Sequence, residues 1–173
     1  MTSRECGACM LCCKVMGITA LQKPPGQWCA HCETGKGCAI YAGRPGECAT
    51  FACAWLTDER FGPEWKPDKA KFVLVIDQAR KRFTVHVDPD QPGAWKRNPY
   101  YPKLRETMLA ALARGWHPFV IVAGHYSLVL PEGEHRLGKL GDADDFSVTI
   151  RLPAGGRPEI TVTKADGSVR PLD

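Results

Sequence analysis

The segment Cys6-Gly7-Ala8-Cys9-Met10-Leu11-Cys12-Cys13 places four cysteines within eight consecutive residues. Two thiols separated by two residues can bind one metal because the intervening turn brings both sulfurs to the same side. A third thiol at this spacing can reach another corner of a tetrahedral or cubane site, and bacterial ferredoxins use it around a four-iron cluster. Cys12 and Cys13 are adjacent, so we expect their side chains to point apart and one of them to serve another site or none.

A second set of cysteines follows at wider spacing. Cys29-Ala30-His31-Cys32 repeats the two-residue separation, and all nine cysteines of the chain lie between Cys6 and Cys53. Nine thiols suffice for two four-coordinate sites with one thiol left over, or for one site with five to spare. The spacing leaves both arrangements open. The candidate metal ligands are Cys6, Cys9, Cys12, Cys13, Cys29, Cys32, Cys38, Cys48 and Cys53.

The donor set leaves the metal open because thiolates suit both zinc and iron–sulfur clusters. Zinc ribbons usually separate two such pairs by about 15–20 residues, and the intervals from Cys9 or Cys12 to Cys29 lie in that range. His31 could replace a sulfur, but a residue inside such a pair more often points outward. The expected cofactor is therefore an iron–sulfur cluster or zinc.

The N-terminal stretch has no basic start followed by an apolar run of about 7–15 residues, as a secretory signal would. No apolar run approaches the roughly 18–20 residues that cross a bilayer. We therefore expect a cytoplasmic protein without a membrane partner, in a compartment where thiols stay reduced. Nine cysteines there indicate metal ligands rather than a disulfide framework.

The cysteines also divide the chain into a metal-binding region, residues 1–56, and a cysteine-free region, residues 57–173, which could fold together as one compact domain. Lys71–Asp77 and Arg82–Asp88 are rich in β-branched and aromatic residues and predict a hairpin. A helix is predicted between Asn98 as N-cap and Gly115 as C-cap, with Pro99 at its first position and one apolar face.

Four later segments complete the prediction: strands at 118–123, 126–130, 146–152 and 159–163. The expected fold class is α+β, with a cysteine-rich, loop-dominated metal-binding N-terminal region packed on a small, mostly antiparallel sheet. That sheet would have four to six strands and carry one main helix. The acidic stretch at 142–145 lacks the remaining ligand pattern of a calcium loop and predicts a solvated turn.

The residues around the later cysteines resemble a known family. Gly37-Cys38-Ala39-Ile40-Tyr41, Arg44-Pro45 and Phe51-Ala52-Cys53-Ala54-Trp55 extend the motif beyond cysteine. Over residues 6–56 the chain resembles the CxxCxxCC family of zinc- or iron-chelating proteins, also called the YkgJ family. The resemblance implies a bacterial, soluble metal-binding protein, often described as an iron–sulfur protein or oxidoreductase. The family often has Arg after the penultimate cysteine, where this chain has Ala49.

Two local expectations accompany the motif. Arg44 is expected to occupy a turn and pair with Glu47 or Glu33, the alternative being a cation placed near the thiolates. Tyr41, Phe51 and Trp55 are expected to form the apolar core of the cysteine-rich region, where they would also shield a cluster from solvent.

The expected function is metal binding, with an iron–sulfur cluster in an electron-transfer or accessory redox role and a redox protein as partner. The alternatives are a zinc-stabilised structural or interaction module without catalysis, and a protein that stores or delivers metal. The sequence identifies no catalytic residue, so enzymatic activity stays open. A net charge of +4 without a concentration of Lys and Arg argues against a nucleic-acid partner.

Overall fold

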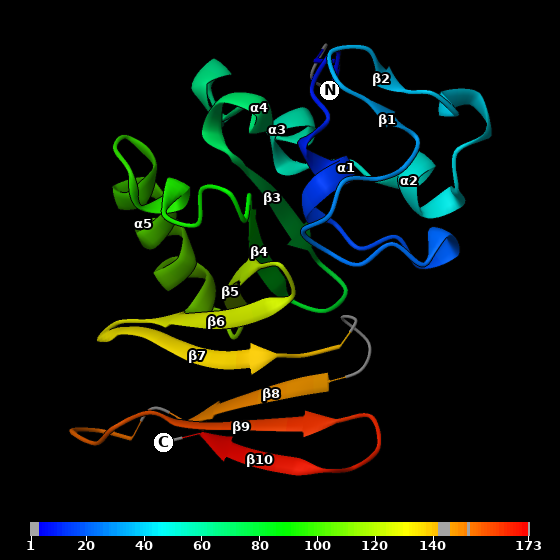
Figure 1. Ribbon diagram of the computed structural model, residues 1–173. Coiled ribbons are helices and arrows are strands. Elements are labelled where there is room, and N and C mark those ends of the chain that lie inside the picture. The colour runs from blue at the N-terminus through cyan, green and yellow to red at the C-terminus, as the bar shows by residue number, and fades with distance from the viewer. Residues whose placement is uncertain (1–3, 142–145, 152, 173) are drawn as a thin grey trace.

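The computed structural model describes residues 4–141, 146–151 and 153–172, and its strands form sheets of five, three and two strands (Figure 1). The strands are β1 Cys32–Glu33, β2 Gly37–Cys38, β3 Phe72–Asp77, β4 Arg82–Val87, β5 His117–Val122, β6 His125–Leu130, β7 Gly133–Lys139, β8 Phe146–Arg151, β9 Glu159–Lys164 and β10 Val169–Leu172. The α-helices are α1 Leu11–Val15, α2 Gly46–Thr50, α3 Ala54–Thr57, α4 Pro67–Ala70 and α5 Tyr100–Leu112. Short 3-10 turns cover Thr19–Leu21, Tyr41–Gly43, Pro63–Trp65 and Ala94–Lys96.

The five-stranded sheet has the order β3-β4-β5-β6-β7. Its neighbours pair antiparallel except β4 and β5, which are parallel because the chain between them crosses over through α5. The predicted hairpin is confirmed, with Phe72 opposite Val87 and Asp77 opposite Arg82. Ala123 and Gly124 both have positive φ, which fits the tight turn that joins β5 to β6.

Helix α5 covers one face of this sheet. Leu104 and Met108 are one turn apart, are almost completely buried, and pack with Val85 of β4 and Val120 of β5. The predicted main helix is confirmed, and its apolar spacing places these residues on the face that packs against the sheet. Its predicted cap is wrong, because Pro99 rather than Asn98 precedes the first turn, and no side chain caps it.

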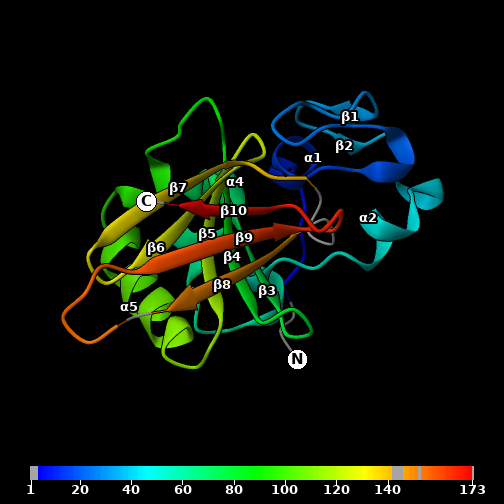
Figure 2. The ribbon, with the colours of Figure 1, turned by 90° about the horizontal axis from the view of Figure 1, so that it is seen from below.

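Two parts of the molecule cover the other face of the sheet: the three-stranded sheet and the cysteine-rich region. The three-stranded sheet, in the order β10-β9-β8, lies across the β5–β7 part (Figure 2). Phe119 and Leu128 meet Phe146 and Val162 in one buried cluster. Over β3, Val73 instead packs against the cysteine-rich region.

The mixed α and β composition and the mostly antiparallel pairing are confirmed, whereas a single small sheet is wrong. The sequence prediction omitted β7 and β10, since neither has a clear run of β-branched or aromatic residues. The acidic turn predicted at 142–145 lies outside the described residues. None of the described helices is long and apolar enough to span a membrane.

The cysteine-rich region consists of α1, α2, α3, the β1–β2 hairpin and connecting turns. Leu11, Val15 and Cys53 form its buried cluster with Val73 of the sheet. This cluster is much smaller than either of the two cores around the five-stranded sheet. The region therefore has little apolar burial of its own to hold its turns in place.

Candidate metal centre

The cysteine-rich region is attached to the sheet by a buried ion pair. Lys14 follows Cys13 in α1, and its Nζ lies 2.6 Å from Oδ1 of Asp88, just beyond the end of β4. Asp90 supplies a second carboxylate at 2.6 Å but is largely exposed. Because Lys14 follows two of the candidate ligands directly, this ion pair fixes the position of α1 against the sheet.

A first group of thiols comprises Cys6, Cys9, Cys12 and Cys53. A turn joins two of them, with the Cys9 N–H donating to the Cys6 carbonyl at 3.0 Å. Cys53 is buried in the cluster that Cys12 also touches. Cys53 interacts electrostatically with Cys6 and Cys9, and Cys12 interacts with the same two. The four thiols therefore lie within electrostatic range of one another, although they are contributed by distant parts of the sequence.

Backbone N–H groups are directed at two sulfurs of this group. The N–H groups of Leu11 and Asp68 donate to the Cys9 sulfur, and those of Trp55 and Leu56 donate to the Cys53 sulfur. Such donors stabilise a sulfur that carries negative charge, as they do in iron–sulfur sites. Burial is the larger effect in the structure, and it raises the pKa of both thiols.

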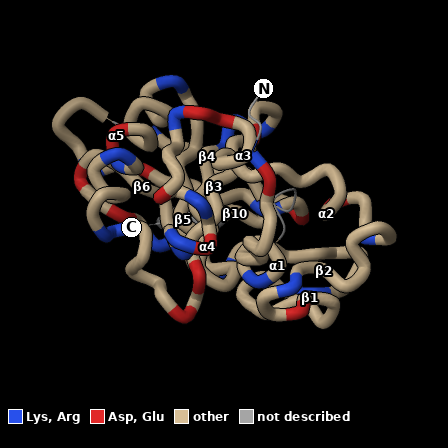
Figure 3. Tube along the Cα trace, turned by 90° about the horizontal axis from the view of Figure 1, so that it is seen from above, with Lys and Arg blue, Asp and Glu red and all other residues tan. Residues whose placement is uncertain are grey.

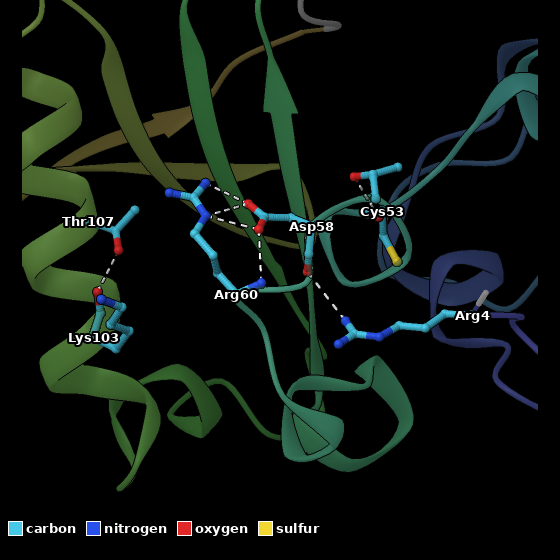
Figure 4. A network of polar contacts seen from close by, with 7 residues as sticks. Arg4, Cys53, Asp58, Arg60, Lys103 and Thr107 are labelled. Carbon is cyan, nitrogen blue, oxygen red and sulfur yellow. Dashed lines mark hydrogen bonds and ion pairs between the residues drawn. The ribbon is translucent and has the colours of Figure 1, made fainter. Parts of the chain in front are cut away.

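Arg4 fastens the N-terminal segment beside the turn that carries Cys53. Its guanidinium donates to the carbonyl oxygens of Trp55 at 2.8 Å and Asp58 at 3.3 Å. Figure 4 shows Arg4 reaching Asp58 while Asp58 also pairs with Arg60, close to Cys53. The contact holds Cys6, two residues after Arg4, on the same side as Cys53.

A second group of thiols comprises Cys13, Cys29, Cys32, Cys38 and Cys48. The Cys29 N–H donates to the Cys13 carbonyl, and the Cys32 N–H donates to the Cys29 carbonyl, both at 3.0 Å. Cys32 lies directly opposite Cys38 in the β1–β2 hairpin. Cys48 interacts electrostatically with Cys13, Cys29 and Cys38.

The two groups meet at α1. Cys12 and Cys13 are expected to point apart, but their thiols interact closely enough that each shifts the pKa of the other, upward for Cys12 and downward for Cys13. The pKa of Cys13 is lowered to about 6, mainly by Cys12, with Cys32 and the ammonium of Lys23 acting in the same direction. The Cys32 thiol itself donates to Sδ of Met10 at 3.5 Å. Burial raises the pKa of Cys32 to about 11.

Lys23 is the residue of this centre that sequence analysis missed. Its side chain is 9% exposed, and its Nζ donates to the carbonyls of Lys14, Met16 and Pro24. Among the described residues no carboxylate lies within ion-pair distance of this ammonium. Its electrostatic neighbours are instead four sulfurs, those of Cys12, Cys13, Cys29 and Cys48. No sequence signal marks a single lysine between two cysteine pairs as buried.

The thiols do not form a ready coordination shell. Over residues 4–141, 146–151 and 153–172, no three His, Cys, Asp or Glu side chains are arranged to hold a metal ion. All nine cysteines are nevertheless free thiols, and neighbouring sulfurs contribute to the raised pKa of Cys12, Cys32 and Cys48. The donor set is therefore chemically suited to zinc or an iron–sulfur cluster, and binding would require the side chains to converge.

Other residues of the motif are placed differently from expectation. Tyr41 is 63% exposed, so it is not part of the core, whereas Phe51 and Trp55 do pack against the Leu11 cluster. Arg44 stacks on Tyr41, with the guanidinium 3.9 Å from the ring centroid. The expected pairing of Arg44 is not observed, since Glu33 pairs with Lys36 and Glu47 accepts the Ala20 N–H. The half-buried His31 offers its carbonyl to Ala39 within the hairpin.

Basic and acidic residues are interspersed over the described chain (Figure 3). The buried cation that acts on the thiols is Lys23, whose charge lowers the pKa of Cys13. Comparisons with known protein families, with curated proteins and with solved structures found no match. The chemistry of the thiols and of their neighbours is thus the basis for assigning a function.

Proposed function

We propose that this chain is a metal-binding protein that holds an iron–sulfur cluster through its N-terminal cysteines and serves an electron-transfer or accessory redox role. The observation that carries the proposal is the group of nine free thiols that interact with one another between Cys6 and Cys53. We place the protein in the cytoplasm, where free thiols stay reduced. A bound cluster would supply one-electron transfer.

The surroundings of the sulfurs support a negatively charged centre. N–H groups donate to Cys9 and Cys53, and the ammonium of Lys23 lies among the sulfurs of the second group. Both features offset thiolate charge, which favours metal binding over protonated thiols. The apolar cluster around Leu11 and Cys53 would limit the access of water to the first group.

A redox partner protein would meet the exposed side of the cysteine-rich region. Trp28, next to Cys29, is 51% exposed, and Tyr41, next to the β1–β2 hairpin, is 63% exposed. Large aromatic side chains are enriched at protein interfaces. These two residues are thus the contact points that we propose for such a partner.

A zinc-stabilised structural module is the second candidate. The observation that favours it is the β1–β2 hairpin, only two residues per strand, with Cys32 opposite Cys38. So short a hairpin gains little from its own backbone pairing, and a structural zinc ion could hold it in place. This candidate predicts a colourless protein that retains its metal in air.

The experiment is purification without oxygen, followed by a visible spectrum and measurement of iron, zinc, copper and acid-labile sulfide. The cluster proposal predicts brown absorbance with iron and sulfide in similar amounts. Zinc without iron or sulfide would reject the cluster and favour the structural module. Variable amounts of several metals that exchange quickly with a competing chelator would favour storage or delivery.

A further inference from the structure

We propose that the nine cysteines serve two adjoining metal sites rather than one, an inference that rests on the proposed metal binding. The first site would use Cys6, Cys9, Cys12 and Cys53, and the second would use four of Cys13, Cys29, Cys32, Cys38 and Cys48. The sites would adjoin at α1, which supplies one neighbouring cysteine to each.

The first site is assigned from its position against the sheet. Cys53 is 6% exposed and packs with Leu11 and Val73, so its sulfur is held at the base of the cysteine-rich region. Cys12 touches the same cluster, while the Cys6–Cys9 turn is fastened nearby through Arg4. Three cysteines at two-residue spacing plus one remote cysteine give the four donors that a cluster or zinc ion requires.

The second site is assigned from backbone bonds that the first site does not share. The Cys13 carbonyl accepts the Cys29 N–H, which brings the Cys29–Cys32 turn onto the C-terminal half of α1. Pairing of β1 with β2 then places Cys38 opposite Cys32. Glu47 of α2 accepts the Ala20 N–H at 2.8 Å. This bond attaches α2, which carries Cys48, to the turn that follows α1.

The positive charge of Lys23 distinguishes the second site from the first. A metal ion or cluster held by four thiolates carries about two net negative charges. A buried ammonium with carbonyl partners gains stability when such charge develops beside it. Lys23 has Cys13, Cys29 and Cys48 among its neighbours, so it would compensate the second site more than the first.

The test compares Cys53→Ser and Cys48→Ser with the unaltered full chain, all purified without oxygen and analysed for metal per folded chain. Two sites predict that Cys53→Ser retains about half of the metal. Cys48→Ser also retains about half, unless Cys48 is the spare thiol, in which case Cys29→Ser takes its place. The double variant that combines one ligand change in each site retains almost none. Loss of all metal from either single variant, or loss from neither, would overturn the division. An unaltered chain without metal would instead reject the proposed function itself.

Cys53 is buried, so its replacement could unfold the region. The exposed Cys6 and the hairpin residue Cys38 provide a second pair, Cys6→Ser and Cys38→Ser, with folding checked by circular dichroism. If Cys38 is the spare thiol of the second site, the Cys38→Ser variant keeps all its metal. The Cys29→Ser variant then serves as the second-site variant of the pair. Loss of all metal from Cys6→Ser or from Cys29→Ser in a folded chain would again overturn the division.

A charge variant then tests the role of Lys23. In the Cys6→Ser background, which keeps only the second site, Lys23→Met is expected to lower metal retention against a competing chelator at least tenfold. In the background of a second-site variant that has lost half of the metal, the same change should have little effect. In the Cys6→Ser background, Lys23→Arg in place of Lys23→Met should restore most of the loss. Lys36→Met, an exposed lysine in the hairpin turn, is the matched control. Equal losses in both backgrounds would contradict the assignment of Lys23.

Discussion

The ammonium of Lys14 lies 2.6 Å from the carboxylate of Asp88, and the two side chains are only 6% and 11% exposed. One partner follows Cys13 in the cysteine-rich region, and the other follows β4 of the main sheet. The contact therefore joins the candidate metal centre to the part of the molecule with the larger apolar cores. Breaking such a pair leaves an uncompensated charge in a buried place.

Replacing Lys14 by Met should lower the free energy of unfolding by about 3 kcal/mol, because Asp88 then stays buried without its partner. The measurement is urea unfolding of the metal-free chain. Asp90 also pairs with Lys14, but its side chain is 77% exposed, so Asp90→Asn should cost less than about 1 kcal/mol. Equal losses in the two variants would contradict the importance assigned to Asp88.

His86 of β4 should make the protein sensitive to acid. Burial lowers the pKa of His86 to about 4, and its Nδ1 has no hydrogen-bond partner among the described residues. In the unfolded chain His86 takes up a proton near pH 6.5. Its contribution to the free energy of unfolding is therefore fully present above that pH and is lost as the pH decreases toward 4. The loss amounts to at most about 3 kcal/mol.

The measurement for His86 is the free energy of unfolding of the metal-free chain between pH 7.5 and pH 4. His86→Leu should flatten the curve over the window from about 6.5 to 4. His125→Gln changes an exposed histidine and should leave the curve as in the unaltered chain. An identical pH dependence in His86→Leu would show that His86 does not carry the effect.

Met108 of α5 is fully buried against the sheet, so Met108→Ala should cost about 2–5 kcal/mol through lost burial and the cavity that remains. Glu106, on the exposed side of the same helix, pairs with Lys103 at 3.3 Å. Glu106→Ala should therefore cost less than about 0.5 kcal/mol. Urea unfolding measures both, and a Met108→Ala cost near that of Glu106→Ala would contradict the packing of α5.

Metal removal should loosen the cysteine-rich region before the sheet, because the cluster around Leu11 is small. Hydrogen exchange with and without a strong chelator measures this effect. Amides of the β1–β2 hairpin and α2 should exchange at least tenfold faster without metal, whereas β5 and β6 should change little. Uniform acceleration throughout the chain would show that the cysteine-rich region and the sheet unfold as one unit.

The parts of the fold that sequence predicts are those with local signals. A continuous β-rich run identifies β3, alternating apolar residues identify β4, and the spacing of Leu104 and Met108 identifies α5. Strand β7 was missed because its sequence, Gly-Glu-His-Arg-Leu-Gly-Lys, buries only Leu137 and lacks that alternation. The cysteine spacing identifies the candidate ligands but not their grouping, since Cys53 reaches Cys6 only through tertiary packing.

The buried lysines show the same limit. Lys14 and Lys23 read as ordinary surface residues in sequence, because nothing local shows that Asp88 or several sulfurs will face them. Tyr41 shows the converse, since an aromatic residue within a motif suggests a core position, yet it is exposed and stacked by Arg44.

The most direct test of the account is the native mass of the intact chain purified without oxygen, measured before and after unfolding in acid. Metal binding predicts a folded mass that exceeds the chain mass by bound metal, with sulfide in addition if the group is a cluster, and loss of that excess on unfolding. A folded chain at the mass of the metal-free protein with nine reduced cysteines would contradict the account.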